Sequence, residues 1–225
     1  MQPGIKNHSK TAGLLLLGLI VCQSVSAHVS AQELDNISKK DAAFIYLIVG
    51  FKHIIPQGID HILFVLSLFL LSPKLKPIIW QSAAFTIAHS VTLIIAAYNK
   101  ITPPTQIVEP LIALSILYVA VENIISPRLK PSRIGIVFFF GLIHGLGFAG
   151  ALSEMGLPRN AYFTSLIMFN VGVEIGQLII ILTAWLFLAK WFSQKDYYRS
   201  RIVIPLSVAI AMIAAFWTIQ RTFLT

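Results

Sequence analysis

The chain has few charged residues and a single cysteine, and each shortage excludes a class of protein. Charged residues make up 12% of its 225 residues, against about 25% in a typical soluble domain. Hydrophobic residues make up 56%, and several apolar runs approach the roughly 20 residues that span a bilayer. The composition therefore excludes an ordinary soluble domain and predicts an all-α, polytopic transmembrane helix bundle.

The single cysteine, Cys22, lies at the end of a predicted signal peptide. Lys6 and Lys10 give a basic start, residues 12–22 are apolar, and small residues follow at the expected cleavage site. We therefore expect residues 1–27 to be removed; the alternative is an uncleaved first helix, for which the run is short. The mature chain then has no cysteine, which excludes disulfides and thiolate metal ligands.

After the signal peptide, we expect a short external segment, 28–40, and one six-span transmembrane domain, 41–225. The predicted spans are 41–71, 78–98, 107–125, 134–152, 162–189 and a last one that ends near residue 219. The first span is broken at Pro56 and Gly58, because proline removes a backbone donor and glycine loosens the helix. Free backbone carbonyls at such a break are tolerated where they line a cavity.

Lysine and arginine are spread unevenly over the predicted loops, and this predicts the orientation. Nine lie in the loops after the first, third and fifth spans: Lys74, Lys76, Arg128, Lys130, Arg133, Lys190, Lys195, Arg199 and Arg201. The other short loops hold only Lys100 and Arg159. The positive-inside rule places the nine in the cytoplasm, which leaves both mature termini outside a bacterial inner (plasma) membrane. The net charge of +8 thus serves orientation, and we expect no nucleic-acid partner.

Histidines and acids lie inside these apolar spans, where a charge costs roughly 2.5 kcal/mol or more at a helix centre. The candidate metal ligands are His53, Asp60, His61, His89, Glu122, His144, Asn170 and Glu174. With a rise of about 1.5 Å per residue, several of them fall at similar depth in four different spans. No basic residue lies deep in the predicted spans, so we expect these acids to lack a basic partner. Such an acid is protonated, hydrogen-bonded or paired with a bound cation.

Nearby residues support a shared site at this depth. A polar stripe on one face of the fifth span consists of Asn170, Glu174 and Gln177. Gly141 and Gly145 flank the histidine of the fourth span and allow close helix approach. We expect Thr86 and Thr92, three residues on either side of His89, to orient its ring. Each feature also has a simpler explanation in helix packing, but their convergence favours a cation site.

The chemistry of these side chains narrows the choice of ion. Imidazole nitrogen with carboxylate oxygen suits nickel, cobalt, zinc or copper rather than magnesium or calcium. A proton relay would use the same residues, because histidine titrates near neutrality. We expect His61, His89 and His144 to approach one another in a shared polar cavity.

Several motifs resemble one known family. The first is residues 50–64, which holds His53, Asp60 and His61; the others are residues 85–93, 108–109, 112–115, 119–123, 140–148 and 169–177. On these motifs the chain resembles the HupE/UreJ family of bacterial membrane proteins over about residues 45–190. The resemblance implies a six-span inner-membrane protein with a cleaved signal peptide, in a family whose better-known members are nickel permeases and some relatives are assigned to cobalt.

The motifs also depart from those of the hydrogenase-linked members. Six residues lie between His53 and Asp60, where those members have five. Residues 140–148 hold only His144, where those members have a second histidine and a nearby glutamate. The resemblance to this branch therefore fixes the fold more firmly than the metal.

Three functions are compatible with these residues. The first is a divalent-metal permease for nickel or cobalt, with the ion as substrate, no prosthetic group, and metalloenzyme-maturation or outer-membrane uptake proteins as partners. A nucleotide-binding G-x-x-x-x-G-K-[ST] loop is absent, so energy would come from a gradient or a partner. The second is an intramembrane zinc hydrolase, with His61, His89 and His144 as ligands and Asp60 or Glu174 as base. The third is a membrane-embedded assembly partner; the oligomeric state stays open.

Overall fold

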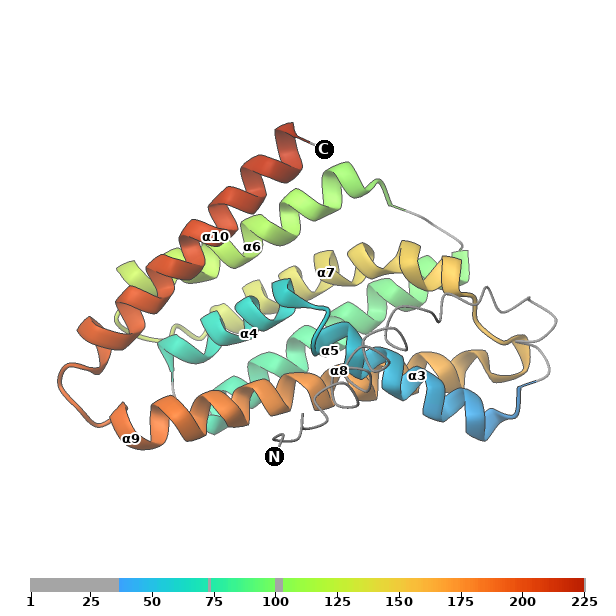
Figure 1. Ribbon diagram of the computed structural model, residues 1–225, viewed down its shortest axis with the longest axis horizontal. Helices are drawn as coiled ribbons and strands as arrows, with labels where there is room; N and C mark the ends of the chain where they lie inside the picture. Colours follow the sequence, from blue (N-terminus) through green and yellow to red (C-terminus); the bar gives the residue numbers. More distant parts are fainter. Residues whose placement is uncertain (1–36, 73, 100–102, 225) are drawn as a thin grey trace, which may run out of the picture.

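Figure 1 shows the computed structural model of the chain, an elongated bundle of helices. The structure describes residues 37–72, 74–99 and 103–224. The predicted signal peptide and most of the predicted external segment lie outside the described residues. The last two residues of that segment, Lys39 and Lys40, are already helical.

The helices follow the predicted spans closely. They are α3 (Lys39–Ile54), α4 (Ile59–Leu71), α5 (Leu75–Asn99), α6 (Thr105–Ile125), α7 (Arg133–Met155), α8 (Tyr162–Ala184), α9 (Lys190–Phe192) and α10 (Ile204–Phe223), with a 3-10 turn η1 (Arg159–Ala161) and two π-helical turns, η2 (Trp185–Ala189) and η3 (Arg199–Val203). Among the described residues, five helical stretches are long and apolar enough to cross a membrane, and the bent pair α3–α4 makes a sixth. The all-α polytopic bundle is therefore confirmed, and its last span runs a turn further than predicted.

The predicted break in the first span is confirmed, and it bends the chain by 67°. Pro56 has no N–H for a helical hydrogen bond and disfavours helix at the residue before it, so α3 ends at Ile54. Gly58 is required by a close approach, because an added Cβ would lie 2.2 Å from the carbonyl oxygen of His53. The bend therefore sets the end of α3 directly beside the start of α4.

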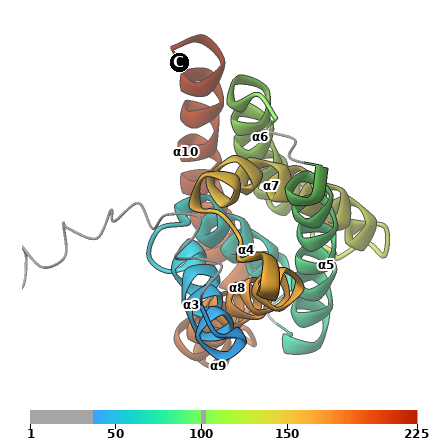
Figure 2. The same ribbon diagram turned by 90° about the vertical axis from the view of Figure 1, so that its right-hand side faces the viewer.

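The other long helices lie around α4, as the end-on view in Figure 2 shows. The closest pairs are α3 with α8, α5 with α7, and α6 with α10, while α4 contacts α5, α6, α8 and α10. Most of α4 is buried, including Phe64, Leu68 and Phe69. A helix that is apolar all round belongs in a protein core, and α4 is the centre of this one.

Glycines let two of these pairs pack backbone against backbone. An added Cβ at Gly50 would lie 1.9 Å from a carbonyl oxygen of α8, and one at Gly172 would lie 2.1 Å from a carbonyl oxygen of α3. The corresponding distances to carbonyls of α5 are 2.5 Å for Gly141 and 2.3 Å for Gly145. The predicted close approach at Gly141 and Gly145 is confirmed, and it brings the helices of His89 and His144 together.

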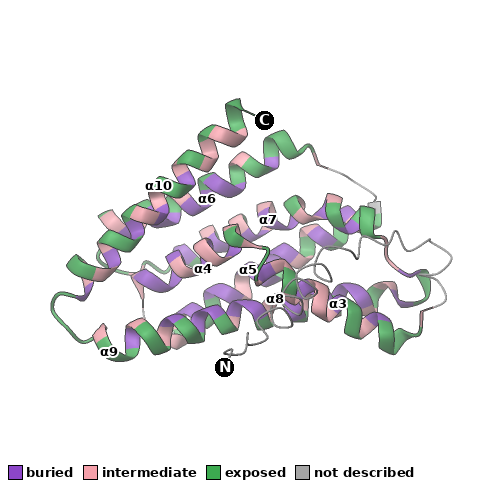
Figure 3. Cartoon of the chain, in the orientation of Figure 1, coloured by how far each residue is buried: buried purple, intermediate pink, exposed green. Residues whose placement is uncertain are grey.

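Many of the exposed positions on the outer faces of the bundle, green in Figure 3, carry apolar side chains. Large hydrophobic side chains exposed there include Phe44, Trp80, Phe139, Phe163 and Phe216. In water such a surface would drive association, whereas in a bilayer it contacts lipid tails. The protein is therefore a multi-pass membrane protein.

We expect Gly172→Ala to lower the thermal unfolding midpoint of the purified protein. The added methyl group would meet the Leu47 carbonyl oxygen at 2.1 Å, and overpacking of this kind typically costs about 1–3 kcal/mol. Gly135→Ala is the matched control, because nothing lies within 4 Å of its added Cβ. Tryptophan fluorescence on heating measures both, and equal midpoints for the two variants would contradict the backbone contact between α3 and α8.

Candidate metal centre

The four histidines in the described part of the chain lie together inside the bundle. His53 lies in the last turn of α3, His61 lies in the first turn of α4, and His89 and His144 lie near the middle of α5 and α7. Their ring centroids are 4.7 Å apart for His53–His61, 5.0 Å for His61–His144 and 5.9 Å for His61–His89. The predicted approach of His61, His89 and His144 is confirmed, and His61 lies between the other two. The predicted shared cavity is wrong for His89, which does not line the cavity that His61 and His144 line.

The histidines whose ring nitrogens lie closest together include His53, which was not expected to be in the closest set. One ring nitrogen from each of His53, His61 and His89 lies within 4.8 Å of the other two. Bonds from zinc to imidazole nitrogen are about 2.0–2.1 Å long, so two nitrogens on one such ion are at most about 4.2 Å apart. In a tetrahedral shell the nitrogens would be about 3.4 Å apart, so the three rings would have to move closer together to share an ion.

Unpartnered nitrogens point to a ligand at this group. Nε2 of His53, Nε2 of His61 and both ring nitrogens of His89 are buried without a hydrogen-bond partner. Buried polar atoms in proteins nearly always have one, and exceptions call for an explanation such as an unseen ion. Three imidazoles that share one ion would satisfy this need.

His144 is held by a serine that the sequence reasoning did not single out. The Ser115 hydroxyl donates to the Ile112 carbonyl oxygen at 2.7 Å, and Ser115 Oγ lies 2.9 Å from His144 Nε2. Because the hydroxyl hydrogen is already used, His144 Nε2 donates to Ser115, and Nδ1 keeps its lone pair. A metal-binding histidine is typically fixed in this way through its other nitrogen. Nδ1 of His144 has no other partner.

Phenylalanines wall the histidines off from the rest of the bundle. Phe148 lies 4.0 Å and Phe169 lies 5.7 Å from His53, measured between ring centroids. Phe85 lies 5.0 Å from His144. An apolar shell of this kind limits the access of water and lowers the local dielectric.

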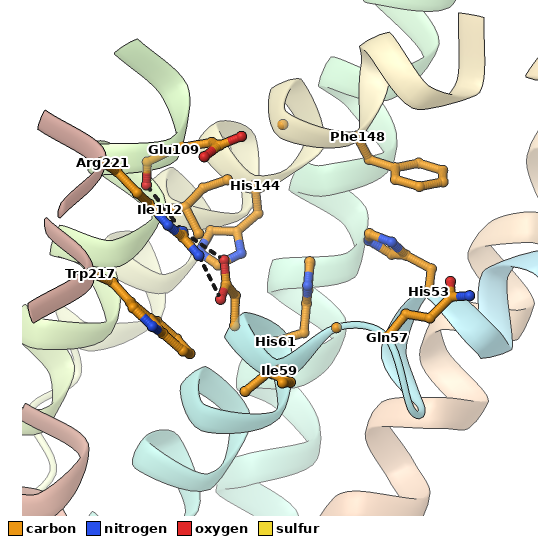
Figure 4. Close-up of a pocket in the computed structure, with 13 residues that line it drawn as sticks. His53, Gln57, Ile59, His61, Glu109, Ile112, His144, Phe148, Trp217 and Arg221 are labelled. Atoms are coloured by element: carbon orange, nitrogen blue, oxygen red, sulfur yellow. Dashed lines mark hydrogen bonds and ion pairs between the residues drawn. The ribbon is translucent and has the colours of Figure 1, made fainter. Parts of the chain in front are cut away.

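A cavity of about 430 Å³ leads to the histidines from one end of the bundle (Figure 4). His53, His61 and His144 line it, while His89 is fully buried and does not. At the mouth lie the start of α6, with Glu109, and the end of α10. His89 is therefore the innermost member of the group.

Asp60 has a basic partner, contrary to expectation. Arg221 donates from Nη1 to Asp60 Oδ2 at 2.8 Å and from Nη2 to Oδ1 at 3.2 Å (Figure 4). The guanidinium also lies over the Trp217 ring, 5.1 Å from its centroid. The prediction was wrong because the sixth span was expected to end near residue 219, whereas α10 carries Arg221 back to the cavity mouth.

Glu122 is a second correction. It forms an ion pair of 3.4 Å with Arg133, which was expected to be a loop residue and instead begins α7 with only 1% of its surface exposed. Arg133 also donates to Asn123 Oδ1 from both Nη1 and Nη2 at 3.2 Å. Glu122 lies near the opposite end of α6 from Glu109, so the structure does not bring it to the histidines.

The predicted polar stripe on α8 faces α5 and forms a seam with it. Thr86 donates to Glu174 Oε2 at 2.6 Å, and its hydroxyl oxygen lies 3.1 Å from Gln177 Oε1. Ser82 donates to the same Gln177 oxygen at 2.6 Å. Asn170 lies next to His89 but makes no hydrogen bond of good geometry with its ring. Glu174 therefore belongs to the seam and not to the three-histidine group.

The prediction that two threonines orient His89 was wrong. The hydroxyl of Thr92 donates to the Leu142 carbonyl oxygen of α7 at 2.9 Å, and Thr86 serves the seam. Both hydroxyls therefore tie α5 to neighbouring helices and leave the His89 ring nitrogens without a partner.

A comparison with known protein families identifies the family of the chain. The model of the family described as "HupE / UreJ protein" matches residues 28–221, most of the chain. The chain belongs to the HupE/UreJ family. The match covers all four clustered histidines and Arg221, so the whole centre lies in the part that this HupE/UreJ protein shares with its family. No curated protein and no solved structure shows significant similarity to the chain.

We expect Ser115→Ala to weaken the binding of a divalent ion to the purified protein by about 10–100-fold, the range seen when a group that orients a ligand is removed. The reason is that His144 would lose the partner that fixes its tautomer and ring. Equilibrium dialysis against nickel, cobalt and zinc measures the affinity.

Ser153→Ala is the matched control on the same helix as His144, because the Ser153 hydroxyl bonds only a carbonyl of its own helix, Ala149 O, at 2.9 Å. We expect it to bind metal as the wild type does. If Ser115→Ala and Ser153→Ala bind equally well, His144 is not a ligand.

Proposed function

We propose that the protein carries a divalent transition-metal ion, nickel or cobalt, across the bacterial inner membrane through the histidine centre. The observation that supports this best is the set of three buried histidine nitrogens within 4.8 Å of one another, inside a bundle that spans the membrane. Imidazole ligands suit nickel, cobalt, zinc and copper, and the resemblance to known nickel permeases favours the first two.

The cavity offers a route to this centre. Glu109 and Asp60 line its mouth, where carboxylates would raise the local concentration of cations. In this conformation Asp60 forms an ion pair with Arg221, so an arriving ion would compete with the guanidinium for that carboxylate. This competition would lower the affinity of the cavity mouth for the ion. Transport requires such moderate affinity, because each site must release the ion as well as bind it.

Beyond His89 the polar seam offers a way onward. Thr86 and Ser82 lie three and seven residues before His89 on α5, on the same helix face, and they bond Glu174 and Gln177 of α8. A line of oxygen atoms in an otherwise apolar interior favours a path for a cation over a static structural site. This line runs from the histidines toward the other end of the bundle.

The direction of transport follows from the predicted orientation. With the basic loops in the cytoplasm, the cavity mouth faces the periplasm and the seam leads inward. The protein would then take up metal, driven by a gradient or by a partner protein. The hydrolase alternative gains no support, because Asp60 is paired with Arg221 and Glu174 is bonded to Thr86, so neither proposed base is placed beside the three histidines.

Uptake of radioactive nickel, cobalt and zinc into cells that express the protein tests this function, and we expect Asp60→Asn to abolish it at a matched protein level. Asparagine keeps the size of aspartate but loses the charge that would bind the ion. The double variant Asp60→Asn with Arg221→Gln separates two explanations, because it removes the arginine charge as well. Uptake restored by the second substitution would show that Asp60 only neutralises Arg221.

We expect reporter fusions at Lys76, Lys130 and Lys195 to report the cytoplasm. Lys76 lies in the first turn of α5, and Lys130 and Lys195 lie in the basic loops between α6 and α7 and between α9 and α10. A reporter active only in the periplasm and one active only in the cytoplasm together give the side for each loop. Periplasmic signals at two of the three sites would reverse the proposed direction of uptake.

A further inference from the structure

A second cavity, of about 680 Å³, lies at the opposite end of the bundle from the mouth of the histidine cavity. It is formed by the end of α4, the loop after α6, and the turn between α8 and α10 (at the left of Figure 1). The residues that matter here are Lys74, Trp185, Lys190, Tyr198, Arg199 and Val203. None of them takes part in the histidine centre or in the seam.

Both π-helical turns of the described chain line this cavity. Trp185 and Ala189 come from η2, and Arg199 and Val203 come from η3. Such turns account for well under about 1% of residues in proteins and occur frequently at functional sites. Two separate π-helical turns that line the same cavity indicate a binding site rather than an irregularity of helix packing.

The lining carries positive charge and no carboxylate. Lys74, Lys190 and Arg199 contribute three cationic side chains. Arg199 is fixed at the edge, because it donates to the carbonyl oxygens of Ser126 at 3.2 Å and Ile124 at 2.9 Å. A cavity of this charge repels divalent metal, so it is not an exit for the transported ion, and it attracts an anion.

An unpartnered donor supports the same conclusion. Tyr198 lines the cavity with only 8% of its surface exposed, and its hydroxyl has no hydrogen-bond partner. A phenol O–H without an acceptor is costly when buried. A phosphate oxygen would accept from Tyr198 and pair with the lysine ammonium groups.

The other half of the cavity is apolar and adjoins the lipid-facing surface. Leu70, Leu71 and Trp185 belong to its wall, and Phe187 and Trp191, exposed on 66% and 63% of their surface, lie on the outside of the same turn. Aromatic residues and lysines of this kind mark the level of the lipid headgroups. A free inorganic anion has no use for an apolar wall, whereas a lipid has both parts.

We propose that this cavity binds an anionic phospholipid. The phosphate would contact Lys74, Lys190 and the Tyr198 hydroxyl, and the part of the acyl chains next to the headgroup would contact the apolar wall. Basic pockets between membrane helices bind anionic headgroups in this way. The lipid would stabilise the turn that joins α8 to α10, the helix that carries Arg221. This proposal is independent of metal transport and stands or fails separately from it.

Native mass spectrometry of the purified full-length chain, with phosphatidylglycerol and phosphatidylcholine in competition, tests the proposal. We expect the wild type to retain phosphatidylglycerol preferentially. In the double variant Lys74→Gln with Lys190→Gln this preference should fall about thirtyfold, since each lysine near a headgroup contributes about fivefold. Tyr198→Phe, which keeps the ring and removes only the hydroxyl, should also reduce it.

Lys195→Gln is the matched control, because Lys195 lies in the same turn but does not line the cavity; it should retain lipid as the wild type does. Thermal unfolding with added phosphatidylglycerol or inorganic phosphate distinguishes the two sources of phosphate. Stabilisation by inorganic phosphate alone, equal retention of both lipids, or an unchanged preference in the Lys74/Lys190 variant would each overturn the proposal.

Discussion

The bend between α3 and α4 is the constraint on which the histidine centre depends. On a straight helix, His53 and His61 would lie more than two turns apart, too far to share an ion. The turn at Pro56 bends the chain by 67°, and Gly58 permits the tight contact with the His53 carbonyl. The two rings then stand 4.7 Å apart, and α5 and α7 need only add one histidine each.

The cost of charge in the membrane explains where the acids are found. Asp60 and Glu122 are each paired with an arginine at opposite ends of the bundle, where α10 and α7 can supply one from their termini. An unpaired buried charge costs several kcal/mol, and a pair roughly offsets that cost. Glu174, deeper in the bundle, relies on a neutral hydroxyl. The interior between the two arginines is thus reserved for groups that are neutral or that bind a cation.

The spans and the break could be predicted from the sequence because both depend on local features. Apolar runs mark the helices, and Pro56 with Gly58 marks the interruption. The depth of each histidine followed from the rise of the helix, so their convergence was also predictable. Which three histidines lie closest together could not be predicted, because that depends on how far the bend moves His53 into the bundle.

Partners that are distant in sequence could not be predicted in the same way. Arg221 lies 161 residues after Asp60, and nothing near Asp60 indicates that α10 ends beside it. Ser115 lies 29 residues before His144, and a serine in a membrane helix usually bonds its own backbone. Such pairings depend on which helices pack together. A single sequence shows which face of a helix is hydrophobic but not which other helix that face contacts.

The enclosure of His89 has an electrical consequence. Its ring lies 5.9 Å from that of His61, and the cavity reaches only as far as the outer histidines. Two divalent ions about 6 Å apart would repel each other by about 11 kcal/mol at an effective dielectric constant of about 20. In the proposed function the four imidazoles would therefore hold one ion at a time, because an ion shared by His53, His61 and His89 would exclude a second one at His144.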